Sequence, residues 1–325
     1  MDTNLSPKVV LAGGTGFLGR RLQRVYAAAG YDVVVLTRQP EKVAAPARGV
    51  AWDPARFTDW TKELEGAAAV VNLAGKNVNC RYTKSARAEI LRSRINSVRA
   101  LAEAVRRCGV PPAVWVQAGS LAIYGDAGPL WCDETAPVGE GFAPEVCRKW
   151  EAAFFKAPLP PIRRVMLRIG FVLGNEGGAL PVLARLAQGF AGAAAGNGRQ
   201  LVSWIHAHDM DRIFLRAVED PALEGTFNAC TAGPVTNAEL MAELRGLYHR
   251  PWVPGMPAWF VKIAAWAMGL ESSLALTGRR GLPGRLMEAG FRFDYPALSP
   301  ALDELLLGPR LAAMVPDRMT QAAAR

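Results

Sequence analysis

A run of glycines near the start of the chain has the spacing of a phosphate-binding loop. The loop reads GGTGFLG and consists of Gly13, Gly14, Thr15, Gly16, Phe17, Leu18 and Gly19. The first of three glycines spaced three apart permits a tight turn, the second lets a diphosphate approach the backbone, and the third lets a helix pack on a strand. The N-terminus of that helix offers free N–H groups and a positive dipole to the phosphates. Because an expected strand precedes the loop and an expected helix follows it, the pattern predicts a dinucleotide site.

The end of the next expected strand discriminates between the two nicotinamide dinucleotides. The stretch YDVVVLTR ends in Thr37 and Arg38, and no carboxylate follows before Glu41. An NAD site usually has an acidic residue here to hold the ribose 2′-hydroxyl. A hydroxyl and a guanidinium suit a 2′-phosphate instead. The sequence therefore predicts NADP as the cofactor, and the alternative is that Arg38 is a solvated loop residue.

The elements that must position these residues alternate between strand and helix. Strands are expected at 8–14, 31–38, 67–75, 113–120 and 163–174, and helices at 17–30, 85–109 and 145–157. Repeated β–α alternation predicts an α/β fold with a doubly wound parallel sheet covered by helices on both faces. Ligands in such folds bind beyond the carboxyl ends of the strands, so the residues directly after each strand are the site candidates.

The alternation weakens in the second half of the chain. The stretch RPWVPGMP carries three prolines at 250–257 and is the best candidate for a boundary. We expect a dinucleotide-binding domain of Rossmann type at 8–250, a smaller C-terminal substrate lobe at 251–308 and a flexible tail at 309–325. The apolar stretch 256–270 is shorter than the ~20 residues that span a bilayer. It is interrupted by Lys262 and is expected to form a buried helix, with interfacial membrane contact as the alternative.

Composition excludes several classes of function. The formal net charge is +9, but the cations are scattered along the chain rather than gathered in a stripe, which argues against nucleic-acid binding. A basic surface can instead attract an anionic cofactor or substrate. The five cysteines stand apart from one another, as expected for reduced thiols in a cytoplasmic protein. No metal is expected, because HAH at 206–208 is not a zinc ligand set.

Several motifs in one order resemble the extended short-chain dehydrogenase/reductase superfamily. They are GGTGFLG, NLAG (72–75), AGSLAIYG (118–125), RIGFVLG (168–174), WIHAHDM (204–210) and FNACTAGPVTNAEL (227–240). More narrowly, VNLAG, SRIN, WE, GNGRQ, SWIH and RLMEAGF resemble its atypical branch of sugar-nucleotide epimerase-related proteins. The match runs from about residue 8 to 305. The resemblance implies an epimerase-like oxidoreductase fold with a small-molecule substrate.

The resemblance also implies roles for individual residues. Those implied to lie beside the cofactor are Leu73, Ala74, Gly75, Glu89, Arg94 and Val172. Ser120 matches the catalytic serine or threonine, and Asn96 matches the asparagine of a proton relay. Those that match the substrate loop are Arg199, Gln200, Trp204 and His206. Relatives often dimerise through a helix pair, and the helix at 85–109 could serve in a homodimer.

The acid–base pair of the superfamily is missing from its usual place. A tyrosine there exchanges the proton, and a lysine four residues later lowers the pKa of that tyrosine. Aligning FAPEVCRKWEAA on Glu151 places Ala143 and Cys147 at these two positions. Lys149 is about 200° around the helix from Cys147 and points away. Tyr124, His206 and an activated Cys147 are the remaining candidates for the proton donor.

Two hypotheses about function follow. The first is an NADP-dependent oxidoreductase or epimerase with a non-standard proton donor, in which Ser120 polarises a carbonyl and Arg168, Arg199 and His206 meet an anionic or hydroxylated substrate. The second is a non-catalytic NADP(H)-binding sensor or scaffold. The second predicts nucleotide binding without turnover.

Overall fold

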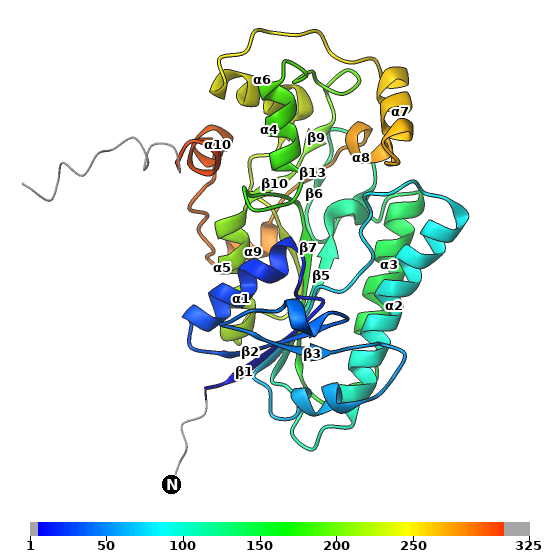
Figure 1. Ribbon diagram of the computed structural model, residues 1–325, viewed down its shortest axis with the longest axis vertical. Helices are drawn as coiled ribbons and strands as arrows, with labels where there is room; N and C mark the ends of the chain where they lie inside the picture. Colours follow the sequence, from blue (N-terminus) through cyan, green and yellow to red (C-terminus); the bar gives the residue numbers. More distant parts are fainter. Residues whose placement is uncertain (1–5, 309–325) are drawn as a thin grey trace, which may run out of the picture.

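A seven-stranded parallel sheet forms the centre of the protein in a computed structural model that describes residues 6–308 (Figure 1). The strands, in sheet order, are β11 (Gly225–Ala229), β7 (Arg163–Ile169), β5 (Val114–Ser120), β4 (Ala69–Asn72), β1 (Lys8–Ala12), β2 (Asp32–Thr37) and β3 (Arg48–Ala51). Because β1 is paired with β2 on one side and β4 on the other, the strand order reverses at this point. A crevice for a ligand is expected beyond the carboxyl ends of β1 and β4.

Helices cover both faces of this sheet, as the sequence predicts. The helices α1 (Phe17–Ala28) and α5 (Ala207–Glu219) pack on one face, and α2 (Lys84–Arg106) and α3 (Phe142–Phe155) pack on the other (Figure 1). Alternate residues of β1 point to opposite faces. Val9 and Leu11 enter the core beneath α1 and α5, whereas Val10 and Ala12 enter the core beneath α2 and α3. The doubly wound α/β fold is therefore confirmed.

The remaining elements extend the chain around the carboxyl edge of the sheet and into a smaller lobe. The short strands are β6 (Trp131–Cys132), β8 (Phe171–Leu173), β9 (Leu201–Val202), β10 (Trp204–His206), β12 (Val235–Thr236) and β13 (Arg280–Gly281). The short helical turns are η1 (Pro40–Lys42), η2 (Asp59–Leu64) and η3 (Leu121–Tyr124). The other helices are α4 (Leu180–Gln188), α6 (Asn237–Leu247), α7 (Ala258–Ala267), α8 (Ser273–Leu276), α9 (Gly284–Glu288) and α10 (Leu298–Leu306).

The core of the C-terminal lobe combines segments from both sides of the expected boundary at residue 250. Leu180 of α4 and Leu240 of α6 pack together with Leu302 of α10. The lobe therefore takes two helices from the part of the chain assigned to the first domain, and the division at 250–251 stays a prediction. The tail expected at 309–325 lies outside the described residues.

The apolar segment at 256–270 forms a helix, but the expectation that this helix is buried is wrong. Only Val261 and Ala265 of α7 are buried, and Trp259, Ile263 and Trp266 are exposed. The physical reason is that α7 lies at the outer edge of the lobe, where a neighbour covers only one of its faces (Figure 1). Within residues 6–308, no helix has the length and apolarity needed to cross a membrane.

Candidate active site

The glycines of the loop between β1 and α1 have different neighbours. Gly13 has a φ of 75°, and a Cβ added there would lie 2.7 Å from the Cα of Ala74. A Cβ on Gly19 would lie 2.1 Å from the carbonyl oxygen of Gly14. A Cβ on Gly16 would have no atom within 4 Å. Gly13 and Gly19 are therefore needed for packing within the protein, while Gly16 leaves open space at the N-terminus of α1, where a diphosphate can approach.

The side chains of the same loop turn mostly into the protein. The Phe17 ring packs so closely under the loop after β8 that a Cβ on Gly174 would lie 2.4 Å from its Cζ. Leu18 packs against the core under α1 and α5. The carbonyl of Gly14 accepts a hydrogen bond from Gln23 Nε2 at 2.8 Å, and Thr15 is exposed. The loop thus offers its backbone rather than its side chains to a ligand, except at Thr15.

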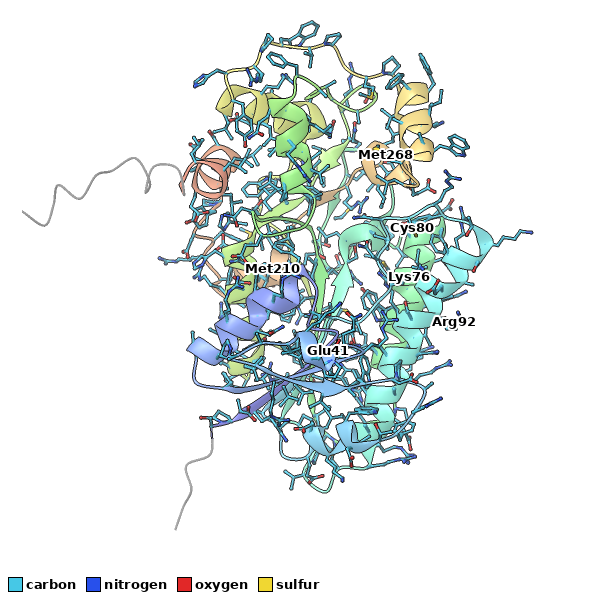
Figure 2. The ribbon with its side chains drawn as sticks, in the orientation of Figure 1. Glu41, Lys76, Cys80, Arg92, Met210 and Met268 are labelled. Carbon is cyan, nitrogen blue, oxygen red and sulfur yellow. The ribbon has the colours of Figure 1, made fainter. Side chains whose placement is uncertain are left out.

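Cations gather beyond the end of β2. Thr37 is buried and its Oγ1 accepts a hydrogen bond from the backbone N–H of Gln39 at 3.2 Å, whereas Arg38 is exposed. Across the crevice, Lys76 Nζ lies 2.6 Å from Glu89 Oε2. The bond from Lys76 lowers the pKa of Glu89, and the charge of Arg38 adds a smaller effect. Figure 2 shows Lys76 beside α2. Arg38 and Lys76 are therefore both cationic neighbours of Glu89.

The end of β4 is fixed by a buried amide network. Asn72 Nδ2 donates to Gln117 Oε1 at 2.9 Å, and Asn72 Oδ1 accepts from the N–H of Ala74 at 3.0 Å. The N–H of Leu73 donates to the carbonyl of Ala12 at 2.9 Å. This network holds the expected cofactor segment 73–75 against the end of β1. Val172, in β8, is partly buried and pairs with Ile205 of β10.

Arg94 lies against Gly75 and close to the place of the missing lysine. A Cβ on Gly75 would lie 3.2 Å from Arg94 Cζ. Arg94 Nη1 donates to the carbonyls of Lys76 and Ile90 at 3.0 and 3.1 Å, and its guanidinium lies 5.0 Å from the centre of the Trp150 ring. Burial lowers the pKa of Arg94, while the neighbouring Cys147 opposes this effect. Since carbonyls and a π-face are its only partners in the described chain, this guanidinium can still bind an anion.

Ser120 occupies the position expected of a group that binds a substrate oxygen. It ends β5, and its Oγ accepts a hydrogen bond from the N–H of Ala122 at 3.1 Å. The side chain is only partly buried. Within residues 6–308 its hydroxyl hydrogen has no acceptor, so it is free to donate to a ligand.

Tyr124 does not have the surroundings of a proton donor. Its hydroxyl oxygen accepts from Arg168 Nη1 at 2.8 Å and lies 2.7 Å from the carbonyl of Asp133 and 2.8 Å from Asn228 Oδ1. Burial of the side chain raises the pKa of Tyr124 to about 12. All hydrogen bonds of the Tyr124 hydroxyl are thus made within the protein. They attach the loop that follows β5 to the two strands β7 and β11. The prediction that Tyr124 swings toward a substrate is not supported.

His206 is likewise held by its own neighbours. Its Nδ1 accepts from the N–H of His208 at 3.1 Å, which caps α5, and its Nε2 lies 3.0 Å from Glu304 Oε2. The ring stacks on Tyr295 with 3.9 Å between ring centres. Burial lowers the pKa of His206, although Glu304 opposes this. One ring nitrogen caps α5 and the other faces Glu304 of α10, and His206 makes no hydrogen bond to Ser120 within residues 6–308.

Asn96 lies on the outer side of α2. It lines a surface groove between α2 and α3 together with Arg92, Arg99 and Arg148. Ser97, one position further along, faces the sheet and lies 3.3 Å from Asn72 Nδ2. One residue corresponds to about 100° around a helix, and this rotation turns Asn96 away from Ser120. The relay role expected of Asn96 is therefore not supported. The homodimer expected through this helix stays a prediction.

The helix α3 has the expected face but supplies no acid–base group. Cys147 and Glu151 are both buried, four residues apart. Burial raises the pKa of the Cys147 thiol to about 12. The two oxygens of Glu151 accept hydrogen bonds from Arg168, each at 2.8 Å. Lys149 turns outward and lies 2.6 Å from Glu145. Cys147 is thus an inert thiol, and Arg168 is used in a buried ion pair rather than on a ligand.

Two residues that the sequence reasoning missed complete the surroundings of Cys147. Burial lowers the pKa of Arg279, and Cys147 is the first of the neighbours that oppose this effect. In the described part of the chain the Arg279 guanidinium has no ion-pair partner. The Tyr82 ring packs edge-to-face on Phe142, with 5.1 Å between the ring centres. Burial raises the pKa of the Tyr82 hydroxyl, and Arg94 and Cys147 are among its titratable neighbours. Neither residue follows a strand of the main sheet, so the rule used to select candidates could not find them.

The crevice beyond β1 and β4, with its glycine loop and the hydroxyl at the end of β5, defines a dinucleotide-binding protein of the epimerase type. The family model described as "NAD dependent epimerase/dehydratase family" matches residues 9–230, and a domain of unknown function, DUF1731, matches 256–305. The chain belongs to the NAD dependent epimerase/dehydratase family.

Proteins across several kingdoms resemble this chain over most of its length. The chloroplastic epimerase family protein SDR39U1 homolog of Arabidopsis thaliana is 33% identical, over 92% of this chain and 86% of that protein. The epimerase family protein YfhF of Bacillus subtilis is 32% identical, over 92% and 97%. The crystal structure of human epimerase family protein SDR39U1 (isoform 2) with NADPH superposes with a TM-score of 0.80 at 29% identity, over 92% and 98% of the two chains.

Proposed function

We propose that the protein binds NADP(H) and acts as an epimerase-like oxidoreductase on a small anionic substrate. The observation that carries the cofactor assignment is the crevice itself: open space beside Gly16 at the N-terminus of α1, with Arg38 and no carboxylate at the end of β2. The similar human protein was crystallised with NADPH, which supports the same choice. The residues that would hold the group fit a 2′-phosphorylated dinucleotide.

The substrate class follows from the guanidinium groups of Arg94 and Arg279. Both are desolvated, both lie near the Cys147 thiol, and neither forms an ion pair in the described chain, although Asp126 is a charged neighbour of Arg279. Two such cations near one thiol favour a substrate that carries a carboxylate or a phosphate. This assignment replaces the expected contacts of Arg168 and His206, which other residues occupy.

The chain's own groups can orient the substrate and supply a proton. When bound, the nicotinamide supplies hydride to a carbonyl carbon. Ser120 donates its free hydroxyl hydrogen to the carbonyl oxygen, and we assign proton transfer to Tyr82, which lies near Arg94 and Cys147 and whose hydroxyl, unlike that of Tyr124, has no hydrogen-bond partner within residues 6–308. The phenolic proton moves to the carbonyl oxygen as the C–H bond forms, which gives the alcohol, and solvent then returns a proton to Tyr82.

Replacing Arg38 with glutamate is expected to weaken NADPH binding by about 100-fold and NADH binding much less, since a charge-assisted bond to the 2′-phosphate becomes a repulsion. Calorimetric titration of each dinucleotide measures both constants. The control is Arg106→Glu, an exposed side chain in the last turn of α2, at the end of that helix far from Lys76 and Glu89. Equal loss for both dinucleotides, or no loss, would refute the assignment of NADP.

Turnover is tested with NADPH and a panel of small carbonyl compounds that carry a carboxylate or a phosphate. With any compound that is reduced, Arg279→Gln is expected to raise KM by about 30-fold, the contribution of one charge-assisted pair. Tyr82→Phe is expected to lower kcat by about 100-fold with KM little changed. Tyr31→Phe is the matched control, because its hydroxyl lies 3.5 Å from Glu219 on the far side of the sheet.

A second candidate is a non-catalytic NADP(H)-binding protein. The inert Cys147 and the absence of an acid–base pair on α3 favour it. It predicts tight NADPH binding, no oxidation of NADPH with any compound of the panel, and no effect of Ser120→Ala on binding. The same titrations and assays therefore separate the two candidates.

A further inference from the structure

A cluster of large apolar side chains lies exposed on α7 and the loop before it. We call this cluster the tryptophan face. Its members on α7 and at the C-cap of that helix, with their exposed fractions, are Trp259 (63%), Phe260 (45%), Ile263 (57%), Trp266 (63%) and Met268 (66%), and Trp252 (77%) is exposed on the loop that leads to the helix. Single exposed apolar residues are ordinary, but a cluster with two tryptophans on one short helix marks a surface that contacts something else.

Helix geometry explains how the face is presented. Trp259, Ile263 and Trp266 are spaced by four and three residues, so they lie along one side of α7. Val261 and Ala265 lie on the opposite side and are the buried residues that attach the helix to the lobe. The helix forms the outer edge of the lobe, and the loop before it arches over the end of the molecule (Figure 1). The tryptophan face is therefore open to a partner surface.

The charged groups on this face are mostly cationic. No aspartate or glutamate occurs between Glu243 and Glu271, a stretch that contains Lys262, and Glu271 itself follows the end of α7. Lys262 is exposed between the tryptophans of α7. From another part of the chain, the Arg81 guanidinium lies 4.8 Å from the centre of the Trp266 ring, and Arg81 also donates to the Trp266 carbonyl. The face is thus aromatic at its centre and cationic around it, within a chain of net charge +9.

We propose that the tryptophan face docks the protein on the surface of an anionic lipid bilayer. The indole ring has an apolar body and a polar N–H, and tryptophan accordingly gathers at the level of lipid headgroups. Lys262 and Arg81 complement anionic headgroups. A helix of ten residues is too short to cross a bilayer, so α7 would lie in the plane of the interface.

A second copy of the chain fits this face less well. A stable interface buries about 800 Å² of surface on each partner. The exposed side of α7, a helix of ten residues, offers less surface than this. A two-fold dimer through the face would also bring Lys262 and Arg81 toward their own copies.

Docking on a bilayer through the tryptophan face would bring the candidate active site near the lipid, because Arg81 directly precedes Tyr82. The loop that borders the proposed substrate pocket would then adjoin the lipid surface.

Vesicle co-sedimentation of the full chain tests the proposal. Vesicles of phosphatidylcholine with about 30% phosphatidylglycerol should bind the protein, binding should weaken with added salt, and pure phosphatidylcholine should bind it less. The variant Trp259→Ser/Ile263→Ser/Trp266→Ser should lower the partition coefficient by at least about tenfold, because it removes apolar area that would enter the interface. The control Val182→Ser/Leu186→Ser changes two exposed apolar residues of α4 and should bind as the parent does.

Three results would overturn the proposal. The parent protein does not bind the anionic vesicles, the control variant loses as much binding as the triple variant, or ultracentrifugation without lipid shows a dimer that the triple substitution abolishes. The last result would assign the face to a second copy. Calorimetric titration with NADPH shows that the triple variant is folded, and its outcome is independent of whether the protein binds lipid.

Discussion

Replacing Gly16 with valine is expected to abolish measurable NADPH binding while leaving the protein folded. Gly16 has φ and ψ of −76° and −176°, an extended conformation that valine adopts readily. No protein atom lies within 4 Å of the added Cβ, so nothing in the protein has to move. The free energy of unfolding should change by less than about 0.5 kcal/mol. The branched side chain would nevertheless fill the approach to the N–H groups of α1, and the Kd for NADPH should rise by more than about 100-fold.

Gly19→Val is the contrasting variant in the same loop. Its Cβ would lie 2.1 Å from the carbonyl oxygen of Gly14, so the loop and α1 cannot keep their contact. This variant should lose both stability and NADPH binding, whereas Gly16→Val should lose binding alone. Urea unfolding and calorimetric titration measure the two properties separately. Normal NADPH affinity in Gly16→Val would show that the diphosphate does not bind at this helix.

The fold could be predicted because its signals are local. The alternation of apolar runs with helical spacing depends on neighbours within a few residues, and the glycine loop joins β1 to α1 within one such unit. The end of β2 at Thr37 agrees with the expected strand, and the role of the exposed Arg38 at a 2′-phosphate stays a prediction. These features need no knowledge of what packs against them.

The candidate catalytic residues were harder to predict because their roles depend on partners that are distant in sequence. Tyr124 is held by Asn228, 104 residues away, and His206 by Glu304, 98 residues away. Arg279 approaches Cys147 from a loop of the C-terminal lobe. A sequence shows that a residue is able to exchange a proton, but it does not show that another side chain already occupies that group.

The expected burial of α7 failed for a related reason. Its high content of apolar residues predicts a buried helix only where the fold supplies neighbours on every side. At the outer edge of the lobe, only the face of the helix that carries Val261 and Ala265 is covered by other parts of the described chain. The side chains of the tryptophan face are exposed. The prediction of a helix was confirmed because it rests on composition, while burial depends on position in the fold.

The second large effect is expected at the buried ion pair between α3 and β7. Arg168 Nε and Nη2 each donate to one oxygen of Glu151 at 2.8 Å, and both side chains are nearly fully buried. Glu151→Ala should lower the free energy of unfolding by about 3–5 kcal/mol, because it leaves the Arg168 charge buried with no carboxylate partner. Urea unfolding at neutral pH measures the loss.

The double variant Glu151→Leu/Arg168→Met distinguishes two quantities: the net contribution of the ion pair to the free energy of unfolding, and the penalty for leaving one buried charge without its partner. Both charges are then absent and similar volume fills the space, so much of the lost stability should return. Arg168 also donates to Tyr124, whose hydroxyl keeps its contacts with Asn228 and the carbonyl of Asp133 in the double variant. A double variant as unstable as Glu151→Ala would mean that shape rather than charge governs this site. Breaking the exposed pair of Lys62 and Asp59 in the same assay should have little measurable effect, since water screens both groups.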